Sequence, residues 1–218
     1  ATIHEKKPLE PVAGVEYVTV DLMSPNDCRK VVDGMDYVFI CSANTAGAAV
    51  MAATPLVQVT PNVVMNTQLL DSSYAAGVKK VCFISSSAAY PDTGDRPVKE
   101  DEMMVGDPYD KYYSVGWMKR YSEILCRIYA QKIAKPMATV VIRPSNVYGP
   151  GDKFDPKTSH VTASLVRRVA DRESPFVVWG DGKDVKDLIY IDDFIDGLVR
   201  AFERTDDFLA INIASGKG

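Results

Sequence analysis

The sequence predicts an α/β protein built on a doubly wound parallel sheet, and two observations lead to that prediction. Short runs rich in β-branched and aromatic residues alternate along the chain with longer segments of helical periodicity. The strand-like runs are almost continuously apolar, as expected for strands that helices cover on both faces. In such a sheet, ligands bind at the carboxyl ends of the strands, so the residues that follow each strand are the first candidates for a site.

The first predicted strand and helix follow each other near the N-terminus. Residues 15–20 are rich in valine and end shortly before Ser24. Ser24 is a favourable N-cap, and Pro25 suits the first turn of a helix because that position needs no backbone N–H donor. We therefore expect a helix from this point to about Val32.

Three more strands and two long helices complete the predicted sheet. Residues 36–41 form a nearly continuous apolar strand. The segment 55–76 has apolar residues at helical spacing and is followed by Gly77, a typical C-cap. The remaining elements are a strand at 81–85, a helix at 115–133 and a strand at 139–143.

Small or polar residues follow three of these strands, as expected for a binding edge. They are Cys41-Ser42-Ala43, Ser85-Ser86-Ser87 and Pro144-Ser145-Asn146. After residue 150 the chain becomes more charged and richer in loops. We therefore divide it into a sheet domain, 1–150, and a smaller C-terminal region, 151–218.

Composition excludes several functional classes. Twenty-nine acidic and 25 basic residues give a net charge of −4 without a basic block, so no nucleic-acid partner is expected. No apolar run suits a membrane span or a signal peptide, and the four cysteines show no CxxC spacing, so we expect a cytoplasmic protein without a membrane partner. Two histidines are too few for the usual His-based zinc site or Ser-His-Asp triad, and no metal site is expected.

Four motifs occur in a recognisable order. They are Gly77-Val78-Lys79-Lys80-Val81-Cys82-Phe83-Ile84-Ser85-Ser86-Ser87-Ala88-Ala89-Tyr90, Gly116-Trp117-Met118-Lys119-Arg120-Tyr121-Ser122-Glu123, Arg143-Pro144-Ser145-Asn146-Val147-Tyr148-Gly149-Pro150-Gly151 and Trp179-Gly180-Asp181-Gly182. Together they resemble the extended short-chain dehydrogenase/reductases of the NAD-dependent epimerase/dehydratase family, in particular its UDP-galactose 4-epimerase-like members. The resemblance implies a Rossmann-like sheet, NAD as cofactor with NADP as the alternative, and hydride transfer at a carbon of a nucleotide-sugar substrate.

The resemblance also implies catalytic residues. Such enzymes use a serine at a strand end together with a tyrosine and a lysine four residues apart on a helix, where the ammonium lowers the pKa of the phenol. Ser86 and Lys119 match the serine and the lysine. Val115 stands where the tyrosine is expected, and valine cannot transfer a proton.

Three interpretations of Val115 are open. Tyr113 or Tyr112 reaches the site if the helix starts later than its pattern suggests, and Tyr113 is our candidate. Alternatively, a water molecule held by Ser86 and Lys119 transfers the proton. In the third interpretation the protein is a catalytically degenerate nucleotide-binding protein of the same fold.

The resemblance assigns further residues to the cofactor, most of them directly after strands. They are Asp21, Leu22, Cys41, Ser42, Ala43, Asn62, Ser85, Lys119, Pro144 and Val147. The Gly-rich turn that would bind the pyrophosphate does not occur in the sequence. We therefore expect the chain to lack the first βαβ unit of the family, and its C-terminal end as well.

The residues that the resemblance assigns to the nucleotide sugar are Ser86, Asn146, His160, Val161, Trp179 and Lys186. Lys186 replaces the usual arginine, which keeps the charge but loses the bidentate geometry. Ser87 and Ala88 stand where dehydratases of the family have an Asp-Glu pair. Their absence favours an epimerase or reductase.

The two long predicted helices suggest a homodimer. Segment 115–133 has apolar and aromatic residues on more than one face, which requires more than one packing partner. In many members of the family the equivalents of 55–76 and 115–133 form a four-helix bundle with a second subunit. A deeply buried helix in a monomer is the alternative.

Overall fold

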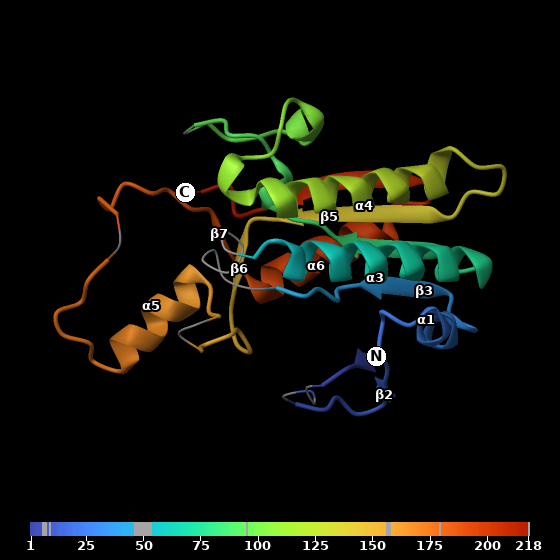
Figure 1. Ribbon diagram of the computed structural model, residues 1–218, viewed down its shortest axis with the longest axis horizontal. Helices are drawn as coiled ribbons and strands as arrows, with labels where there is room; N and C mark the ends of the chain where they lie inside the picture. Colours follow the sequence, from blue (N-terminus) through green and yellow to red (C-terminus); the bar gives the residue numbers. More distant parts are fainter. Residues whose placement is uncertain are drawn as a thin grey trace.

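The computed structural model describes residues 1–5, 8, 10–45, 54–94, 96–155, 158–178 and 180–217. Its centre is a four-stranded parallel sheet in the order β3-β4-β5-β8 (Figure 1). The strands are β3 (Tyr37–Ile40), β4 (Lys80–Ile84), β5 (Ala138–Pro144) and β8 (Phe208–Ile213). The predicted parallel α/β architecture is confirmed.

Two short parallel strand pairs lie beside this sheet. They are β1 (Thr2–Ile3) with β2 (Val18–Thr19), and β6 (Asn146–Tyr148) with β7 (Leu188–Tyr190). The strand predicted at 15–20 is thus only two residues long, and its partner β1 was not predicted. Strands this short leave too little periodicity in a sequence to be recognised.

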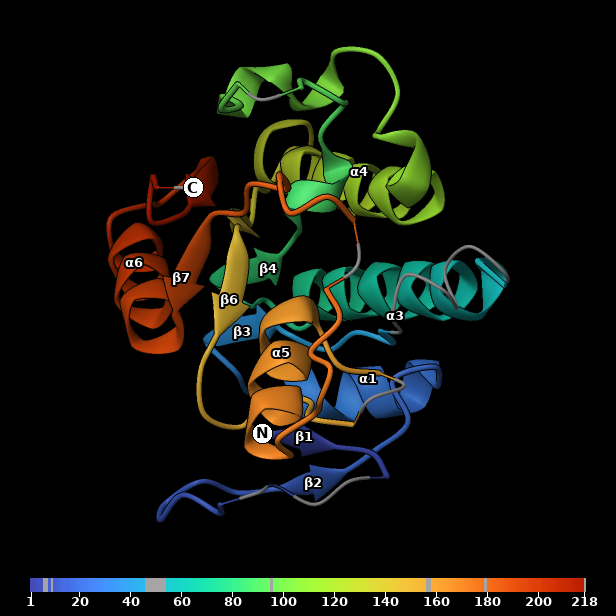
Figure 2. The ribbon, with the colours of Figure 1, turned by 90° about the vertical axis from the view of Figure 1, so that its left-hand side faces the viewer.

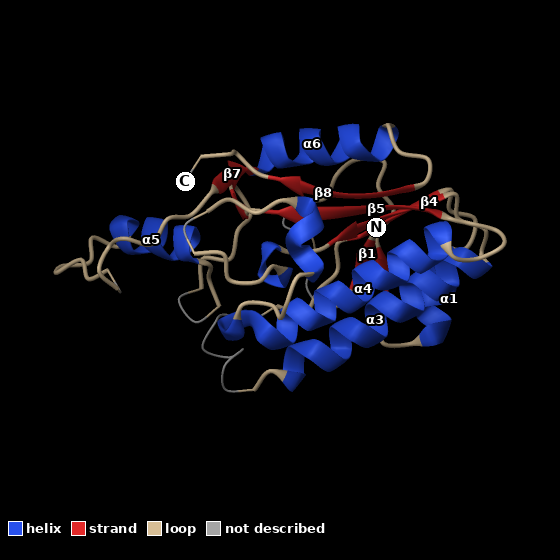
Figure 3. Ribbon diagram, turned by 90° about the horizontal axis from the view of Figure 1, so that it is seen from above, coloured by secondary structure: helices blue, strands red, loops and turns tan. Residues whose placement is uncertain are grey.

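Helices cover both faces of the sheet (Figure 3). On one side lie α1 (Pro25–Val32), α3 (Leu56–Ala75) and α4 (Tyr113–Gln131), and on the other lies α6 (Ile191–Glu203). Short 3₁₀ helices η1 (Ser87–Ala89), η2 (Glu100–Met104) and η3 (Asp110–Tyr112) connect β4 to α4. Helix α5 (Val161–Ala170) lies apart from the layers, beyond β6 and β7 (Figure 1).

The core is divided between the two faces of the sheet. Val81 and Phe83 of β4 pack in the cluster that includes α1, α3 and α4, whereas Cys82 of β4 and Val140 of β5 pack against Phe194 of α6. Alternate residues of one strand therefore enter opposite layers. This two-sided burial is the physical reason for the continuous apolar runs.

The residues after 150 lie partly in the main sheet layers and partly outside them, so the predicted boundary at residue 150 does not separate the sheet from the rest of the chain. Helix α6 and strand β8 belong to the main sheet layers, because β8 pairs with β5 from Thr139↔Phe208 to Pro144↔Ile213. Helix α5 lies outside those layers.

Candidate functional site

The carboxyl ends of β3, β4, β5 and β8 lie at one edge of the sheet, because all four strands are parallel. Figure 2 views the molecule from this side, with α5, β6 and β7 in front. The loop 41–45 follows β3, Ser85 and Ser86 follow β4, and Pro144 ends β5. The sheet thus brings together the strand-end segments that the sequence predicted.

Lys119 is anchored at the end of β4. Its Nζ donates a hydrogen bond to the carbonyl oxygen of Ile84 at 2.7 Å and lies 4.9 Å from the centre of the Phe83 ring. Burial lowers the pKa of Lys119 to about 8, although the charges of Glu123 and Cys41 act in the opposite direction. The side chain is therefore an ammonium ion near neutral pH that loses its proton easily.

Ser86 lies two residues after the carbonyl that Lys119 contacts. It caps η1, and its Oγ accepts a hydrogen bond from the backbone N–H of Ala88 at 3.1 Å. The Ser86 hydroxyl hydrogen has no role in this cap, so the hydroxyl can still donate to a ligand. A serine hydroxyl and a lysine ammonium are therefore placed at the same strand end.

Val115 precedes Lys119 by one helical turn, so the two residues share a face of α4. The first turn of this helix packs closely on η1 through Gly116. A Cβ atom at this glycine would lie 2.4 Å from Pro108 Cβ and 2.8 Å from the carbonyl oxygen of Ala88. The close approach holds the first turn of α4 against the segment that follows Ser86.

Tyr113 lies on another face of α4. The helix begins at Tyr113, two residues before the predicted start, so the condition under which Tyr113 was expected to reach the site, a later start, is not met. Its ring is 46% exposed, packs edge-on at 6.5 Å from Trp117, and lines a shallow groove with Leu56 and Val59 of α3. At roughly 100° per residue, Tyr113 and Lys119 are about 120° apart around the helix.

Tyr112, the other tyrosine considered, ends η3. Its ring lies 6.0 Å from that of Tyr109 in an edge-on arrangement. The structure therefore gives both tyrosines aromatic neighbours and brings neither of them into a described contact with Lys119.

Ser85 takes part in a buried network that the sequence did not reveal. Its hydroxyl donates a short hydrogen bond to the carboxylate of Glu123. Arg143 donates to the same carboxylate, with 2.7 Å between Nη2 and Oε2, and the two side chains are only 6% and 3% exposed. The only sequence signal was that Glu123 and Arg143 stand inside two of the four motifs.

Asn62 shapes the loop after β3. Its Oδ1 accepts from the backbone N–H of Asn44 at 2.8 Å, and its Nδ2 donates to the carbonyl oxygens of Asn44 and Gln58. Asn62 is buried, and its amide is used within the protein. Its observed role is to hold the loop that contains Cys41, Ser42 and Ala43.

The remaining residues predicted to bind the cofactor lie within strands or shortly after them. Asp21 Oδ1 accepts from the backbone N–H of Met23 at 2.9 Å, and Leu22 packs against the core. Pro144 is the last residue of β5, and Val147 of β6 packs against the α6 side of the core. Asp21 and Leu22 follow the separate β1–β2 pair.

The residues predicted to bind the substrate are dispersed. Asn146 begins β6 and donates to the carbonyl oxygen of Asp187 at 3.0 Å, while His160 and Val161 begin α5, beyond β6 and β7. Lys186 lies 3.9 Å from Asp184 in an exposed ion pair. Trp179 lies outside the described residues.

Asp187 is a second residue that the sequence did not reveal. Its carboxylate accepts from the backbone N–H groups of Ser215 at 2.9 Å and Gly216 at 2.7 Å. Burial alone would raise the pKa of Asp187, but these hydrogen bonds lower it overall. Asp187 thereby connects the start of β7 to the loop that follows β8.

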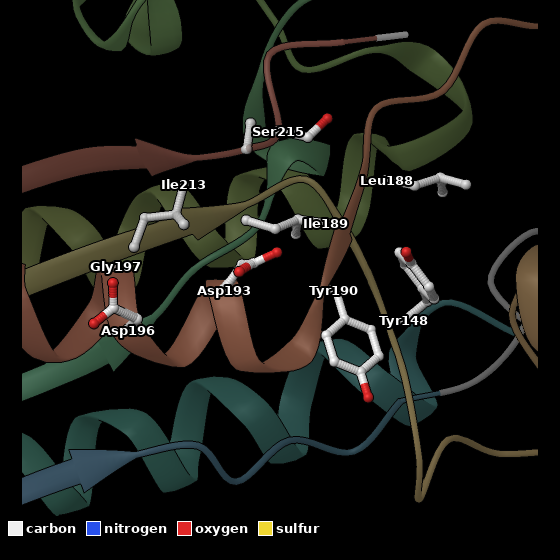
Figure 4. A pocket seen from close by; sticks show the side chains of 10 residues that line it. Tyr148, Leu188, Ile189, Tyr190, Asp193, Asp196, Gly197, Ile213 and Ser215 are labelled. Carbon is white, nitrogen blue, oxygen red and sulfur yellow. The ribbon is translucent and has the colours of Figure 1, made fainter.

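A cavity of about 500 Å³ lies next to this loop (Figure 4). Tyr148, Tyr190, Asp193 and Ser215 are among its lining residues, and the rings of Tyr148 and Tyr190 are 5.5 Å apart. Of the predicted site residues that the structure describes, none lines it. The candidate site at Ser86 and Lys119 is thus distinct from this cavity.

Two findings concern only the part of the chain that the structure describes. Within it, no group of three or more His, Cys, Asp or Glu side chains is arranged to bind a metal ion. Within the same residues, no helix has the length and apolar character needed to cross a membrane.

Comparison with known proteins identifies one family model and several curated relatives. The sequence profile of the NAD dependent epimerase/dehydratase family matches residues 2–214. GDP-L-fucose synthase 1 of Arabidopsis thaliana is 28% identical over 187 residues, which cover 83% of this chain and 57% of that protein. The chain spans less than two thirds of the length of this and two similar curated relatives.

Solved structures agree with the sequence comparison. UDP-N-acetylglucosamine 4-epimerase from Methanobrevibacter ruminantium M1, in complex with UDP-N-acetylmuramic acid, has a TM-score of 0.78 at 27% identity and covers 92% of this chain and 62% of that chain. UDP-glucose 4-epimerase from Thermotoga maritima has a TM-score of 0.81 at 23% identity and covers 100% of this chain and 69% of its own. The second likeness concerns the fold alone.

Proposed function

The chain belongs to the NAD-dependent epimerase/dehydratase family. On this premise we propose that the protein is an NAD(P)-dependent sugar-nucleotide epimerase or a related oxidoreductase. The observation that carries the proposal is the position of the Lys119 ammonium on the Ile84 carbonyl, two residues before Ser86. Bound NAD, or NADP as the alternative, would accept and return a hydride at a carbon of the sugar.

The residues at the strand ends fit a dinucleotide and a nucleotide sugar. The small side chains of Cys41, Ser42 and Ala43 leave the backbone of their loop accessible to a ligand. Lys119 would bind the ribose hydroxyls beside the nicotinamide, and Ser86 would hydrogen-bond the reacting hydroxyl of the sugar. In the same proposal, the other predicted cofactor residues lie along the bound dinucleotide. The nucleotide sugar is contacted by Asn146, His160, Val161, Trp179 and Lys186.

The proton that accompanies the hydride needs a carrier, since Val115 cannot transfer it. A water molecule between Ser86 and Lys119 fits the geometry better than Tyr113, which would require a rearranged first turn of α4. Val115 also favours the second candidate function, a nucleotide-binding protein of the same fold without turnover.

Calorimetry with NAD, NADP and a panel of UDP-, GDP- and dTDP-sugars tests the proposal. We expect Lys119→Met to weaken dinucleotide binding by about tenfold, because it removes a charged hydrogen-bond donor worth about 1.4 kcal/mol or more. The matched control is Lys79→Met, since Lys79 is an exposed lysine paired with Asp36. Equal affinities of the two variants would remove Lys119 from the site, and no binding of any ligand would remove both candidate functions.

We also propose that the protein is a cytoplasmic homodimer that pairs through α3 and α4. Large apolar side chains are exposed on these helices, among them Leu56, Val57, Tyr113, Trp117, Tyr121, Ile124 and Ile128. An exposed apolar surface of this kind is typical of a protein interface. The four cysteines are free, which fits a reducing compartment.

A charge placed in this surface is expected to separate the subunits. Tyr121→Asp should shift the sedimentation coefficient from that of a dimer to that of a monomer, because the carboxylate would lose its hydration in the interface. Val199→Asp is the control, since Val199 is similarly exposed on α6. A parent protein that sediments as a monomer would contradict the proposed dimer.

A further inference from the structure

Glu123 and Arg143 form a buried ion pair next to the candidate site. Arg143 donates to Glu123 through Nε and Nη2, and both side chains are nearly inaccessible to solvent. Replacing a buried ion pair by apolar residues of similar size is often neutral or stabilising. A role other than stability therefore has to be considered for this pair.

The pair ties several segments of the binding edge together. Arg143 Nη1 donates to Tyr90 Oη and to the carbonyl oxygen of Glu100, each at 2.8 Å. The Tyr90 hydroxyl in turn donates to Asn212 Oδ1 of β8 at 2.6 Å. Through these contacts Glu123 is fixed relative to β5, β8 and the connection between β4 and α4.

Glu123 also acts directly on the end of β4. It lies one turn after Lys119 on the same face of α4. Lys119 holds the carbonyl oxygen of Ile84, and Glu123 holds the hydroxyl of the next residue, Ser85. Two residues of one helix thus hydrogen-bond to the last residue of the strand and to the residue directly after it, and Ser86 comes next.

We propose that Glu123 is a positioning residue that sets both the place of Ser86 and the charge of Lys119. This inference rests on the proposed function only for its consequence, which is that Ser86 meets the reacting hydroxyl of the sugar while Lys119 meets the ribose hydroxyls beside the nicotinamide. The geometry itself belongs to the protein without a ligand. Arg143 supports the role by fixing the Glu123 carboxylate.

The electrostatics of Lys119 agree with this role. Among the described residues, the titratable groups that interact with it are Glu123 on its own helix and Cys41 on the loop after β3. Burial favours the neutral amine, and the negative charge of Glu123 opposes that effect. Removing the charge should make Lys119 lose its proton at lower pH.

The test is a pH titration of the Lys119 ammonium in Glu123→Gln. The titration is monitored by NMR in protein labelled with ¹³C at the lysine side chains. Lys119→Arg assigns the signal by removing it. We expect a titration midpoint near pH 8 in the parent protein and a clearly lower midpoint in Glu123→Gln. Glu102→Gln is the matched control, because Glu102 forms an exposed ion pair with Arg96 and should leave the midpoint unchanged.

A second variant keeps the test decisive if Glu123→Gln alone does not fold. Glu123→Gln combined with Arg143→Gln leaves no unpaired buried charge and should also show a lower midpoint, by a smaller amount, because loss of the more distant Arg143 cation acts in the opposite direction. An unchanged midpoint in either folded variant overturns the proposal, and so does a double variant that cannot fold, since the pair would then serve the fold. The titration needs neither cofactor nor substrate, so its failure is distinct from a failure to bind NAD(P).

Discussion

Replacing Val115 with tyrosine is expected to raise the rate of hydride transfer by about 100-fold or more, the usual contribution of a positioned acid–base group. The new phenol would stand one turn before Lys119, on the same face of α4. The neighbouring ammonium would favour its ionised form. The measurement is the formation of NAD(P)H in a single turnover with those nucleotide sugars that bind in calorimetry.

Val115→Phe is the control, because it adds the same ring without the hydroxyl. If it accelerates the reaction as much as tyrosine does, the gain comes from packing, and the acid–base interpretation is wrong. Tyr113→Phe in the parent protein completes the comparison. Abolished turnover in Tyr113→Phe would show that Tyr113 reaches the site during the reaction, whereas full activity would eliminate it as the proton carrier.

The sheet could be predicted from the sequence because its signals are local. Val81 and Cys82 are neighbours in one strand and enter opposite layers, so two-sided burial is visible as an uninterrupted apolar run. The cap at Ser24 likewise depends on a few adjacent residues, and its side chain accepts from Asp27 N–H as expected.

The buried polar contacts could not be predicted in this way. Glu123 and Arg143 are 20 residues apart, and their pairing depends on how α4 packs against β5. Asn62 was predicted to approach a ligand, but a side chain at its position can equally bond to the loop of Asn44. Such choices are made by tertiary contacts that leave no periodic pattern.

The predicted direction of the Tyr113 side chain depends on the exact residue at which the helix begins. Each residue turns an α-helix by roughly 100°, so where the helical backbone begins decides which face a residue near its N-terminus occupies. The described helix begins at Tyr113 and sends its ring toward Trp117. A sequence pattern rarely fixes a helix end to within one residue.

The largest expected loss of stability follows from Arg143→Met. The substitution keeps the approximate length of the side chain but leaves the Glu123 carboxylate buried without its partner. Breaking a buried ion pair from one side typically costs about 3–5 kcal/mol. The free energy of unfolding, measured by urea denaturation near neutral pH, should fall by that amount.

Two comparisons decide whether the unpaired charge is the cause. Arg96→Met breaks the exposed pair with Glu102 and should cost about 1 kcal/mol or less, because water already screens it. Arg143→Met combined with Glu123→Gln should recover much of the lost stability, since the double variant buries no uncompensated charge. If the double variant is as unstable as Arg143→Met alone, the lost hydrogen bonds from Arg143 to Tyr90 and Glu100 cost more than the unpaired charge. The hydrogen bonds of Arg143, rather than the charge of Glu123, would then account for the stability of the network.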